Sequence, residues 1–163
     1  MGNRIDVVRE YVDAVLLAVP DAFVRRCGYL HLYGVAQACA LIALKRGENV
    51  ELATMAGMLH DLYSYKSGDS QNHAEKGAVL ARGVLEELLI LREDEVALIC
   101  SAIHHHSAKE KAHSAFDEVL IDADVMQHCL HDVTKPVTAH EKQRFEKLVD
   151  EFSLGAGLGG YDG

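Results

Sequence analysis

The sequence has no tryptophan and only two prolines, and it contains few of the alternating apolar runs that mark β-strands. Proline interrupts helices, so a chain of 163 residues with two prolines can form long uninterrupted helices. Hydrophobic residues make up 49% of the chain, which is enough to fill one core. The composition therefore predicts a single all-α domain, a compact bundle of about six to seven helices.

Paired cysteines and long apolar runs are also missing. The four cysteines, Cys27, Cys39, Cys100 and Cys129, lie in or beside apolar stretches, and none belongs to a CxxC pair. This spacing argues against a structural zinc site and favours reduced core thiols. The first residues show no signal-peptide pattern, and we find no apolar run of the ~18 residues that suggest a membrane span. The expectation is a cytoplasmic protein that does not bind a membrane.

Positive charge is scarce. Lysine and arginine number 16 against 25 aspartates and glutamates, which gives a formal net charge of −9, and no basic block stands out. This balance argues against binding of a nucleic-acid polymer through its phosphates. A small anionic substrate remains compatible with it, because a bound dication would outweigh the distant surface charge locally.

Apolar residues recur with helical spacing along most of the chain, and capping residues mark where helices begin. The expected helices cover residues 4–19, a short segment from 21, 30–45, 50–63, 73–91, 93–106, 115–131 and 138–152. We expect Gly28 to interrupt the helical pattern, residues 63–72 to form a loop, and Thr138 and Glu141 to form a capping box. Residues 1–152 are thus expected to be one domain, followed by a flexible Gly-rich tail at 153–163.

A histidine followed by an aspartate, His60-Asp61, comes directly after the apolar run 53–59. Imidazole and carboxylate bind divalent metals well, and both are costly to bury without a partner. The small residues Ala53, Ala56 and Gly57 in that run would let a neighbouring helix approach closely. Ligands from two helices could then reach one ion.

Four more residues of ligand type lie at the ends or inward faces of other expected helices: His31, His73, His106 and Asp124. Each has an ordinary explanation by itself, because single histidines and aspartates often face solvent or are hydrogen-bonded in a core. Six such residues in one small helical domain favour a shared metal site over six unrelated side chains.

The triplet His104-His105-His106 needs separate treatment, because consecutive helical positions are about 100° apart and three neighbours cannot all face one ion. His106 continues the apolar stripe of its helix and is the preferred ligand. His105 lies beside that stripe and is the alternative. His104 is expected to point outward.

The order His31, His60-Asp61, Asp124 resembles the HD superfamily of metal-dependent phosphohydrolases over roughly residues 29–131, and this resemblance implies an HD-domain helical bundle. Together with His73 and His106, the pattern resembles the subgroup that binds two metals. Within it, the small bacterial hydrolases that cleave diadenosine tetraphosphate symmetrically are the closest in length and motif spacing. The GYP motif of the HD-GYP cyclic-dinucleotide phosphodiesterases is missing. Ser107-Ala108-Lys109 stands where the tetraphosphate hydrolases have threonine and glycine.

The resemblance implies a divalent-metal centre, with two ions that are iron or manganese, and with magnesium, nickel or zinc as alternatives. One ion would be held by His31, His60, Asp61 and Asp124. Asp61 would bridge to a second ion held by the remaining two histidines, His73 and His106. The ions would supply hydroxide near neutral pH for attack on phosphorus.

The expected substrate is a small phosphorylated molecule of nucleotide type, cleaved at a phosphoester or phosphoanhydride bond. Asp61 and Lys66 are the expected catalytic residues, and Lys66, Lys109 and His128 the expected substrate contacts, although both lysines could equally be solvated. Two other functions use the same residues: a non-catalytic sensor of metal or nucleotide, and a di-iron oxygenase. A homodimer is compatible with the sequence.

Overall fold

The computed structural model describes residues 3–154, and within this range the chain forms eight α-helices, which confirms the all-α fold. The Gly-rich tail expected to be flexible lies, from residue 155 onward, outside the described residues. The helix bounds are α1 Arg4–Leu17, α2 Ala22–Arg46, α3 Val50–Leu59, α4 Leu62–Ser67, α5 His73–Leu88, α6 Glu93–His105, α7 Ala115–Leu130 and α8 Ala139–Glu151.

Two of these bounds correct the sequence-based expectation. Gly28 does not interrupt a helix but lies inside α2, where it faces α1: a Cβ at this position would come within 2.7 Å of the Leu16 side chain. A glycine within a helix costs only about 1 kcal/mol, so close packing can override it. The helix expected over residues 50–63 ends at Leu59, and residues 63–67, expected in a loop, belong to the short helix α4.

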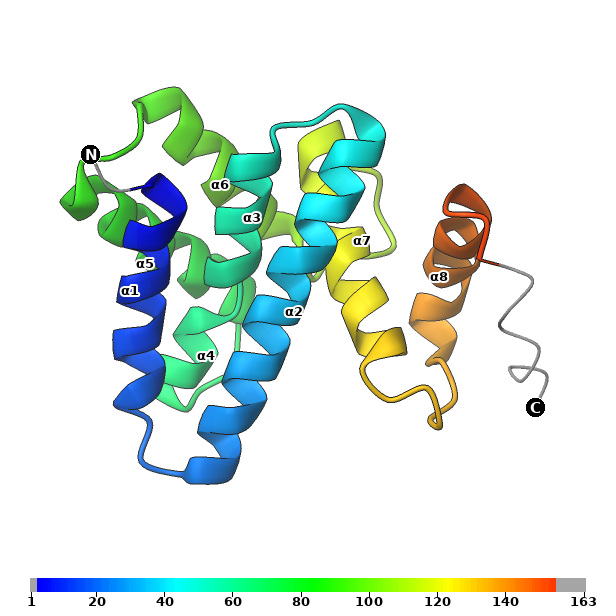
Figure 1. Cartoon of the computed structure of the whole chain (residues 1–163), viewed down its shortest axis with the longest axis horizontal. Coiled ribbons are helices and arrows are strands. Elements are labelled where there is room, and N and C mark those ends of the chain that lie inside the picture. Colours follow the sequence, from blue (N-terminus) through cyan, green and yellow to red (C-terminus); the bar gives the residue numbers. More distant parts are fainter. Residues whose placement is uncertain (1–2, 155–163) are drawn as a thin grey trace.

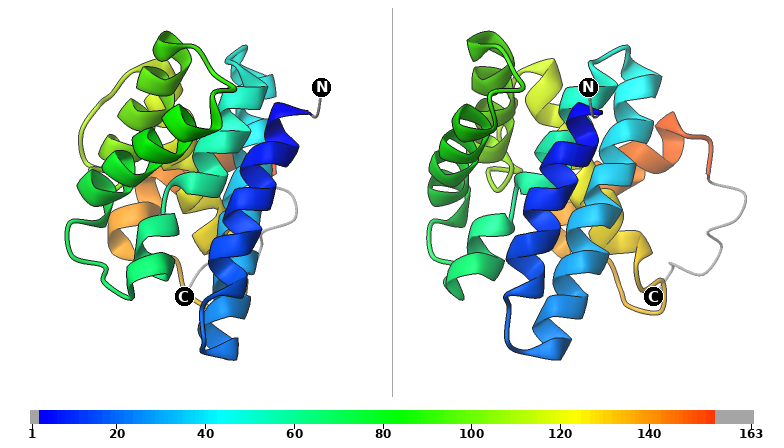
Figure 2. Two further views of the ribbon diagram at one scale, coloured as in Figure 1. Left: turned by 90° about the vertical axis from the view of Figure 1, so that its left-hand side faces the viewer. Right: turned by 60° about the vertical axis from the view of Figure 1, so that its left-hand side comes forward.

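The long helix α2 packs against α3 and α7 and forms the centre of the bundle (Figure 1). Helices α5 and α6 form a pair on one side of this centre, and α8 packs on α7 at the opposite side, as both turned views also show (Figure 2). The core between these layers is apolar and includes three of the four cysteines, Cys39, Cys100 and Cys129. All four thiols are free, as expected.

The closest helix contact lies between α2 and α3. A Cβ built on Gly57 would stand 2.6 Å from the Cα of Ala36 and 2.8 Å from its backbone nitrogen. Only a residue without a side chain fits there. The small residues of the apolar run before His60 therefore allow the close helix approach that the sequence suggested.

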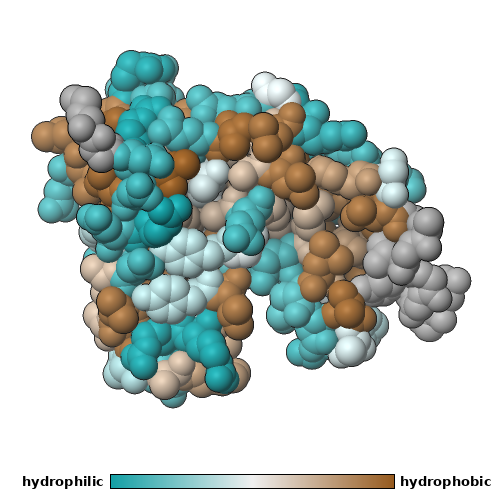
Figure 3. All heavy atoms as spheres, viewed as in Figure 1, coloured by the Kyte–Doolittle hydropathy of each residue, from teal (hydrophilic) through white to brown (hydrophobic). Residues whose placement is uncertain are grey.

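One sequence-based statement about membranes needs correction. Helix α2 is long and apolar enough to cross a membrane by length and composition, and it is the one such helix in residues 3–154. In the structure 44% of the qualifying window is buried within the protein, and core helices also pass this test of length and composition. Polar and apolar residues are interspersed on the face along which α2 runs (Figure 3).

Helix α8 buries Phe145 and Leu148 in the core and also forms ion pairs with α7. Arg144 contacts Glu118 and Asp122 on α7, the latter at 3.0 Å, and it donates hydrogen bonds to the backbone oxygens of Lys109 and Lys111 at 2.7 and 3.1 Å. One guanidinium thus joins α8, α7 and the segment between α6 and α7.

Replacing Arg144 by methionine is expected to destabilise the fold by about 3 kcal/mol, because it leaves the buried carboxylate of Asp122 with one arginine fewer. Urea unfolding measures this change. Arg82→Met is the matched control: Arg82 pairs with Glu86 and Glu93 at the surface, and its loss should cost less than about 1 kcal/mol. Equal costs for the two variants would contradict the proposed role of Arg144.

Candidate metal centre

Six side chains from helices α2, α3, α5, α6 and α7, or from the ends of these helices, lie close together. His31 comes from α2, and Asp124 comes from α7. His60 and Asp61 form the turn between α3 and α4, where the helix ends and the backbone of Asp61 leaves helical geometry (φ −109°, ψ 8°). Two more histidines stand at helix ends: His73 begins α5 and His106 follows α6. All six residues singled out as ligands are thus brought together.

The four histidines face one another in two pairs. The Nε2 atoms of His31 and His60 are 3.0 Å apart, and those of His73 and His106 are 3.2 Å apart. The Nδ1 atoms all point away to oxygen acceptors: those of His60, His73 and His106 donate to backbone carbonyls, and that of His31 to the Gln127 side chain. A neutral imidazole that donates through Nδ1 has a lone pair on Nε2.

Two nitrogen lone pairs facing each other at this distance repel unless a proton or a metal cation lies between them. Nδ1–H bonds to carbonyl oxygens are also the usual support of a metal-binding histidine, since they fix the tautomer and the ring orientation. The arrangement of all four rings is therefore that of ligands.

Asp61 lies between the two pairs. Its Oδ2 is 3.3 Å from His31 Nε2 and 3.6 Å from His60 Nε2, whereas its Oδ1 is 3.3 Å from His106 Nε2 and 3.6 Å from His73 Nε2. Each carboxylate oxygen thus faces a different histidine pair, which is the geometry of a carboxylate able to bridge two ions.

Asp124 completes the first pair. Its Oδ1 lies 3.6 Å from His31 Nε2 and 3.8 Å from His60 Nε2. The Oδ1 atoms of both Asp61 and Asp124 are buried and accept no hydrogen bond from residues 3–154. A buried carboxylate oxygen without a partner is costly, and a divalent cation would satisfy it. The residues present therefore fit a metal centre.

The electrostatics keep His60, Asp61 and Asp124 in the forms that bind metals. Burial lowers the pKa of His60 to about 4, so its imidazole is neutral at pH 7. Burial opposes ionisation of Asp61, but the neighbouring histidines outweigh it and hold the pKa of that carboxyl far below its usual range. Asp124 is likewise held ionised, with a pKa lowered to about 2 against the effect of burial by His60 and Lys109.

The pKa values of His31 and His106 are shifted upward, in the opposite direction to that of His60. Burial opposes their protonation, but Asp61 raises the pKa of both rings above the usual value. Protons on these two rings would offset the buried carboxylates. A metal ion would have to displace such protons, so its affinity should fall with falling pH.

A cavity of about 380 Å³ opens beside the cluster. Besides cluster members, its lining includes Lys109, His128 and His140. The Lys109 ammonium is 2.9 Å from Asp124 Oδ2 and 2.7 Å from Glu141 Oε1, and His128 Nε2 is 3.4 Å from Asp124 Oδ1. Two of the three expected substrate contacts, Lys109 and His128, therefore stand at the cluster.

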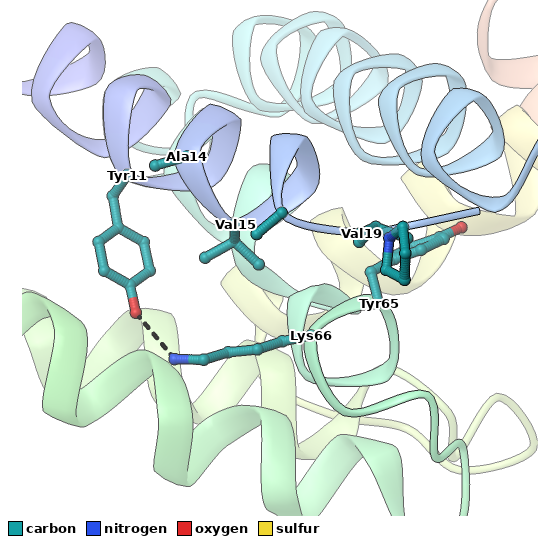
Figure 4. Close-up of a pocket in the computed structure, with 8 residues that line it drawn as sticks. Tyr11, Ala14, Val15, Val19, Tyr65 and Lys66 are labelled. Atoms are coloured by element: carbon teal, nitrogen blue, oxygen red, sulfur yellow. Dashed lines mark hydrogen bonds between the residues drawn. The ribbon is translucent and has the colours of Figure 1, made fainter. Parts of the chain in front are cut away.

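Lys66 does not. Its ammonium lies 3.3 Å from the hydroxyl of Tyr11, and the side chain lines a separate pocket between α1 and α4 (Figure 4). The expected catalytic and substrate-binding role of Lys66 rested on its short distance in sequence from Asp61. Because α4 is a helix rather than a loop, Lys66 is turned towards Tyr11 instead.

The histidine triplet is divided as the helical geometry requires. His106 faces Asp61, His104 is exposed, and His105 turns to Asp117 on α7, with Nδ1 2.9 Å from Asp117 Oδ2. The alternative in which His105 joins the first cluster is therefore not the arrangement of this structure.

Sequence reasoning missed the contribution of α8. Glu141 was expected to cap this helix, and Thr138 does precede it, but neither forms the backbone bonds of a capping box. The buried carboxylate of Glu141 instead accepts hydrogen bonds from Lys109, His128 and the Thr138 hydroxyl. The only sequence signal was a glutamate at the right distance from Thr138, and it gave no indication of Lys109 or His128 as partners.

The fold and the His/Asp cluster define a class of protein. The HD domain family matches residues 28–129, which include all six clustered residues, and the chain belongs to this family. It is also similar to a predicted HD superfamily hydrolase from an uncultured Thermotogales bacterium, with a TM-score of 0.57 and 19% identity over 93% of this chain and 92% of that one.

Among curated proteins, the chain is similar to ribonuclease Y from two strains of Staphylococcus epidermidis. The identity is 28% over 118 residues, which is 72% of this chain but 21% of each relative. The chain thus spans about a fifth of the length of these relatives.

Proposed function

We propose that this protein is a metal-dependent phosphohydrolase that cleaves a phosphoester or phosphoanhydride bond in a small nucleotide-like substrate. The observation that carries the proposal is the position of Asp61, whose two oxygens face two separate pairs of Nε2 atoms. His31, His60, Asp61 and Asp124 would hold one ion, and His73, His106 and Asp61 a second. A mixed nitrogen and carboxylate shell suits iron or manganese.

Divalent ions in such a centre lower the pKa of a water ligand and offset charge on phosphoryl oxygens. The protein's own residues would orient the substrate. Lys109 is positioned to contact a phosphoryl oxygen because its ammonium lies in the cavity wall beside Asp124. Glu141 raises the pKa of Lys109, as Asp124 does, against the effect of burial, so the side chain stays cationic.

The cavity supports a small substrate. Its volume of about 380 Å³ is typical of sites for small molecules, and the net charge of −9 disfavours binding of a polyanionic polymer. The name of the ribonuclease Y relatives makes an RNA phosphodiester the second substrate class to test.

The test begins with protein purified without chelators or added metal. Elemental analysis gives the metal content, and phosphate or nucleotide release is then measured with dinucleoside polyphosphates, mononucleotides, simple phosphoesters and a short RNA. Turnover of a small phosphorylated compound supports the proposal, whereas turnover of RNA alone would replace its substrate class. Tight metal with no turnover of any of these would overturn it in favour of a sensor, and oxygen consumption by an iron form would overturn it in favour of an oxygenase.

The two lysines provide a direct comparison within the site. Lys109→Ala is expected to lower kcat/KM by about 100-fold, because a cation that stabilises transition-state charge on phosphoryl oxygens is lost. Lys66→Ala should leave kcat/KM unchanged, since Lys66 faces Tyr11 outside the site. Steady-state kinetics with metal content as a second readout checks both variants. A larger effect at Lys66 than at Lys109 would contradict the assignment of the substrate cavity.

A further inference from the structure

A second group of ligand-type side chains lies on the other side of the histidine triplet. His105 ends α6, His113 lies in the segment before α7, and Asp117 is in the first turn of α7. One ligand atom from each of the three lies within 4.8 Å of the others. None of these residues belongs to the Asp61 cluster.

Asp117 shows the same sign of a missing partner as the two aspartates of the Asp61 cluster. Its side chain is 3% exposed, and Oδ2 accepts hydrogen bonds from His105 and from the Ser101 hydroxyl. Its Oδ1 is buried and has no hydrogen-bond partner. Within residues 3–154 only three buried side-chain oxygens lack a partner, and the other two are Oδ1 of Asp61 and of Asp124.

His113 is also fixed by a backbone carbonyl, but through the other ring nitrogen than the histidines of the first cluster. Its Nε2 donates to the backbone oxygen of Ala108 at 3.0 Å, which leaves the lone pair on Nδ1. Its ring stacks on that of His105, with centroids 4.7 Å apart. A histidine fixed by a carbonyl through one nitrogen is prepared to bind a metal through the other.

An ordinary ion pair between His105 and Asp117 does not explain all of this. Such a pair uses only Oδ2 of Asp117 and requires nothing of His113. It leaves Oδ1 buried without a partner, which is costly. A cation held by the three side chains would use the ring nitrogen that His113 leaves free and would lie beside the buried carboxylate of Asp117.

We propose that His105, His113 and Asp117 form a separate site for a divalent cation of the zinc type. Two imidazoles and one carboxylate are a common zinc shell, with a water in the remaining position. The site would join α6, the 106–114 segment and α7. Because Lys109 lies in that segment, an ion here would fix the segment that carries the substrate-contacting lysine.

The test uses the full chain, stripped with a chelator and dialysed, then titrated with Zn²⁺ and counted by elemental analysis after gel filtration. His113→Ala and Asp117→Asn should each bind one equivalent fewer than the wild type. His104→Ala is the matched control, because His104 belongs to the same triplet but is exposed, and it should bind as many equivalents as the wild type. Circular dichroism verifies that each variant is folded.

Two outcomes would overturn the proposal: unchanged stoichiometry in folded His113→Ala, or loss of the equivalent in His104→Ala, which would identify adventitious chelation by the triplet. The result is independent of the proposed function, since Asp61→Ala should lose ions of the first cluster and still bind the equivalent that depends on His113. Zn²⁺ at a hundredfold excess over Kd should raise the Tm of Asp61→Ala by about 5–10 °C. The double variant Asp61→Ala/His113→Ala should show no such rise.

Discussion

Asp61→Ala is expected to lose the metal of the main centre and to reduce hydrolysis by at least about 10³-fold, on the order of 4 kcal/mol in the barrier. The reason is geometric. Asp61 is the one residue of the cluster whose oxygens approach both histidine pairs, at 3.3 Å on each side. Without it, neither pair retains its carboxylate bridge. Elemental analysis and product release, measured on the same preparation, give the two readouts.

The isosteric change Asp61→Asn separates charge from shape, because it preserves the side-chain volume and removes the negative charge. It should lose activity nearly as completely as the alanine variant. Asp69→Asn is a suitable control, since Asp69 lies only a few residues further along the chain but pairs with Lys76 at the surface, with Nζ and Oδ2 2.7 Å apart. If folded Asp61→Ala keeps both its metal and its activity, the site is elsewhere.

Gly57→Ala is expected to destabilise the protein by about 3 kcal/mol and to lower its Tm by about 6–12 °C. The added methyl group would meet backbone atoms of Ala36, the nearest at 2.6 Å, and backbone cannot rotate out of the way as a side chain can. Helices α2 and α3 would have to separate. His31 and His60 lie on these two helices or their ends, so metal affinity should fall together with stability.

Gly83→Ala controls for the general effect of a glycine in a helix. Nothing lies within 4 Å of a Cβ at Gly83, which is exposed on α5, so alanine there should stabilise the protein by about 0.5–1 kcal/mol. Thermal and urea unfolding compare the two variants. A Gly57→Ala protein as stable as the wild type would show that the two helices are not held as close as the structure has them.

The cluster also explains why so small a domain buries several charged groups. Asp61, Asp124 and Glu141 are all largely removed from water, and each would be costly without its cationic or metal partner. The Lys109 ammonium forms ion pairs with two of them, Asp124 and Glu141. Metal removal is therefore expected to make the protein less stable as well as inactive, because repulsion among the remaining carboxylates is no longer offset.

Secondary structure and the identity of the clustered residues could be predicted from local patterns. Asn3 and Asn49 cap α1 and α3, and Gly47 ends α2 in the left-handed conformation, each as its residue type favours. The six ligand-type residues could be selected as a set, because so many imidazole and carboxylate groups in one small helical domain, in an order that resembles the HD superfamily, favour a shared site. Helical periodicity also placed His106 ahead of His104 and His105 within the triplet.

Other features depended on distances that no local pattern contains. Lys66 follows Asp61 closely in sequence, yet α4 turns it to Tyr11, while Lys109 reaches Asp124 from a different segment. Glu141 had the spacing of a helix cap but binds Lys109 and His128, because α8 docks on α7 beside the site. His105 and His106 contact different aspartates, and this could not be predicted without knowing the position of Asp117.

That the chain is helical, and which side chains could bind a metal, could be predicted from residue type and spacing along single helices. Three facts required the packed structure: which of these side chains lie together, that Asp61 faces one histidine pair with each oxygen, and that Lys109 is the lysine beside them. These facts depend on how separate helices pack, and that packing is set by contacts such as Gly57 against Ala36, which join residues far apart in the chain.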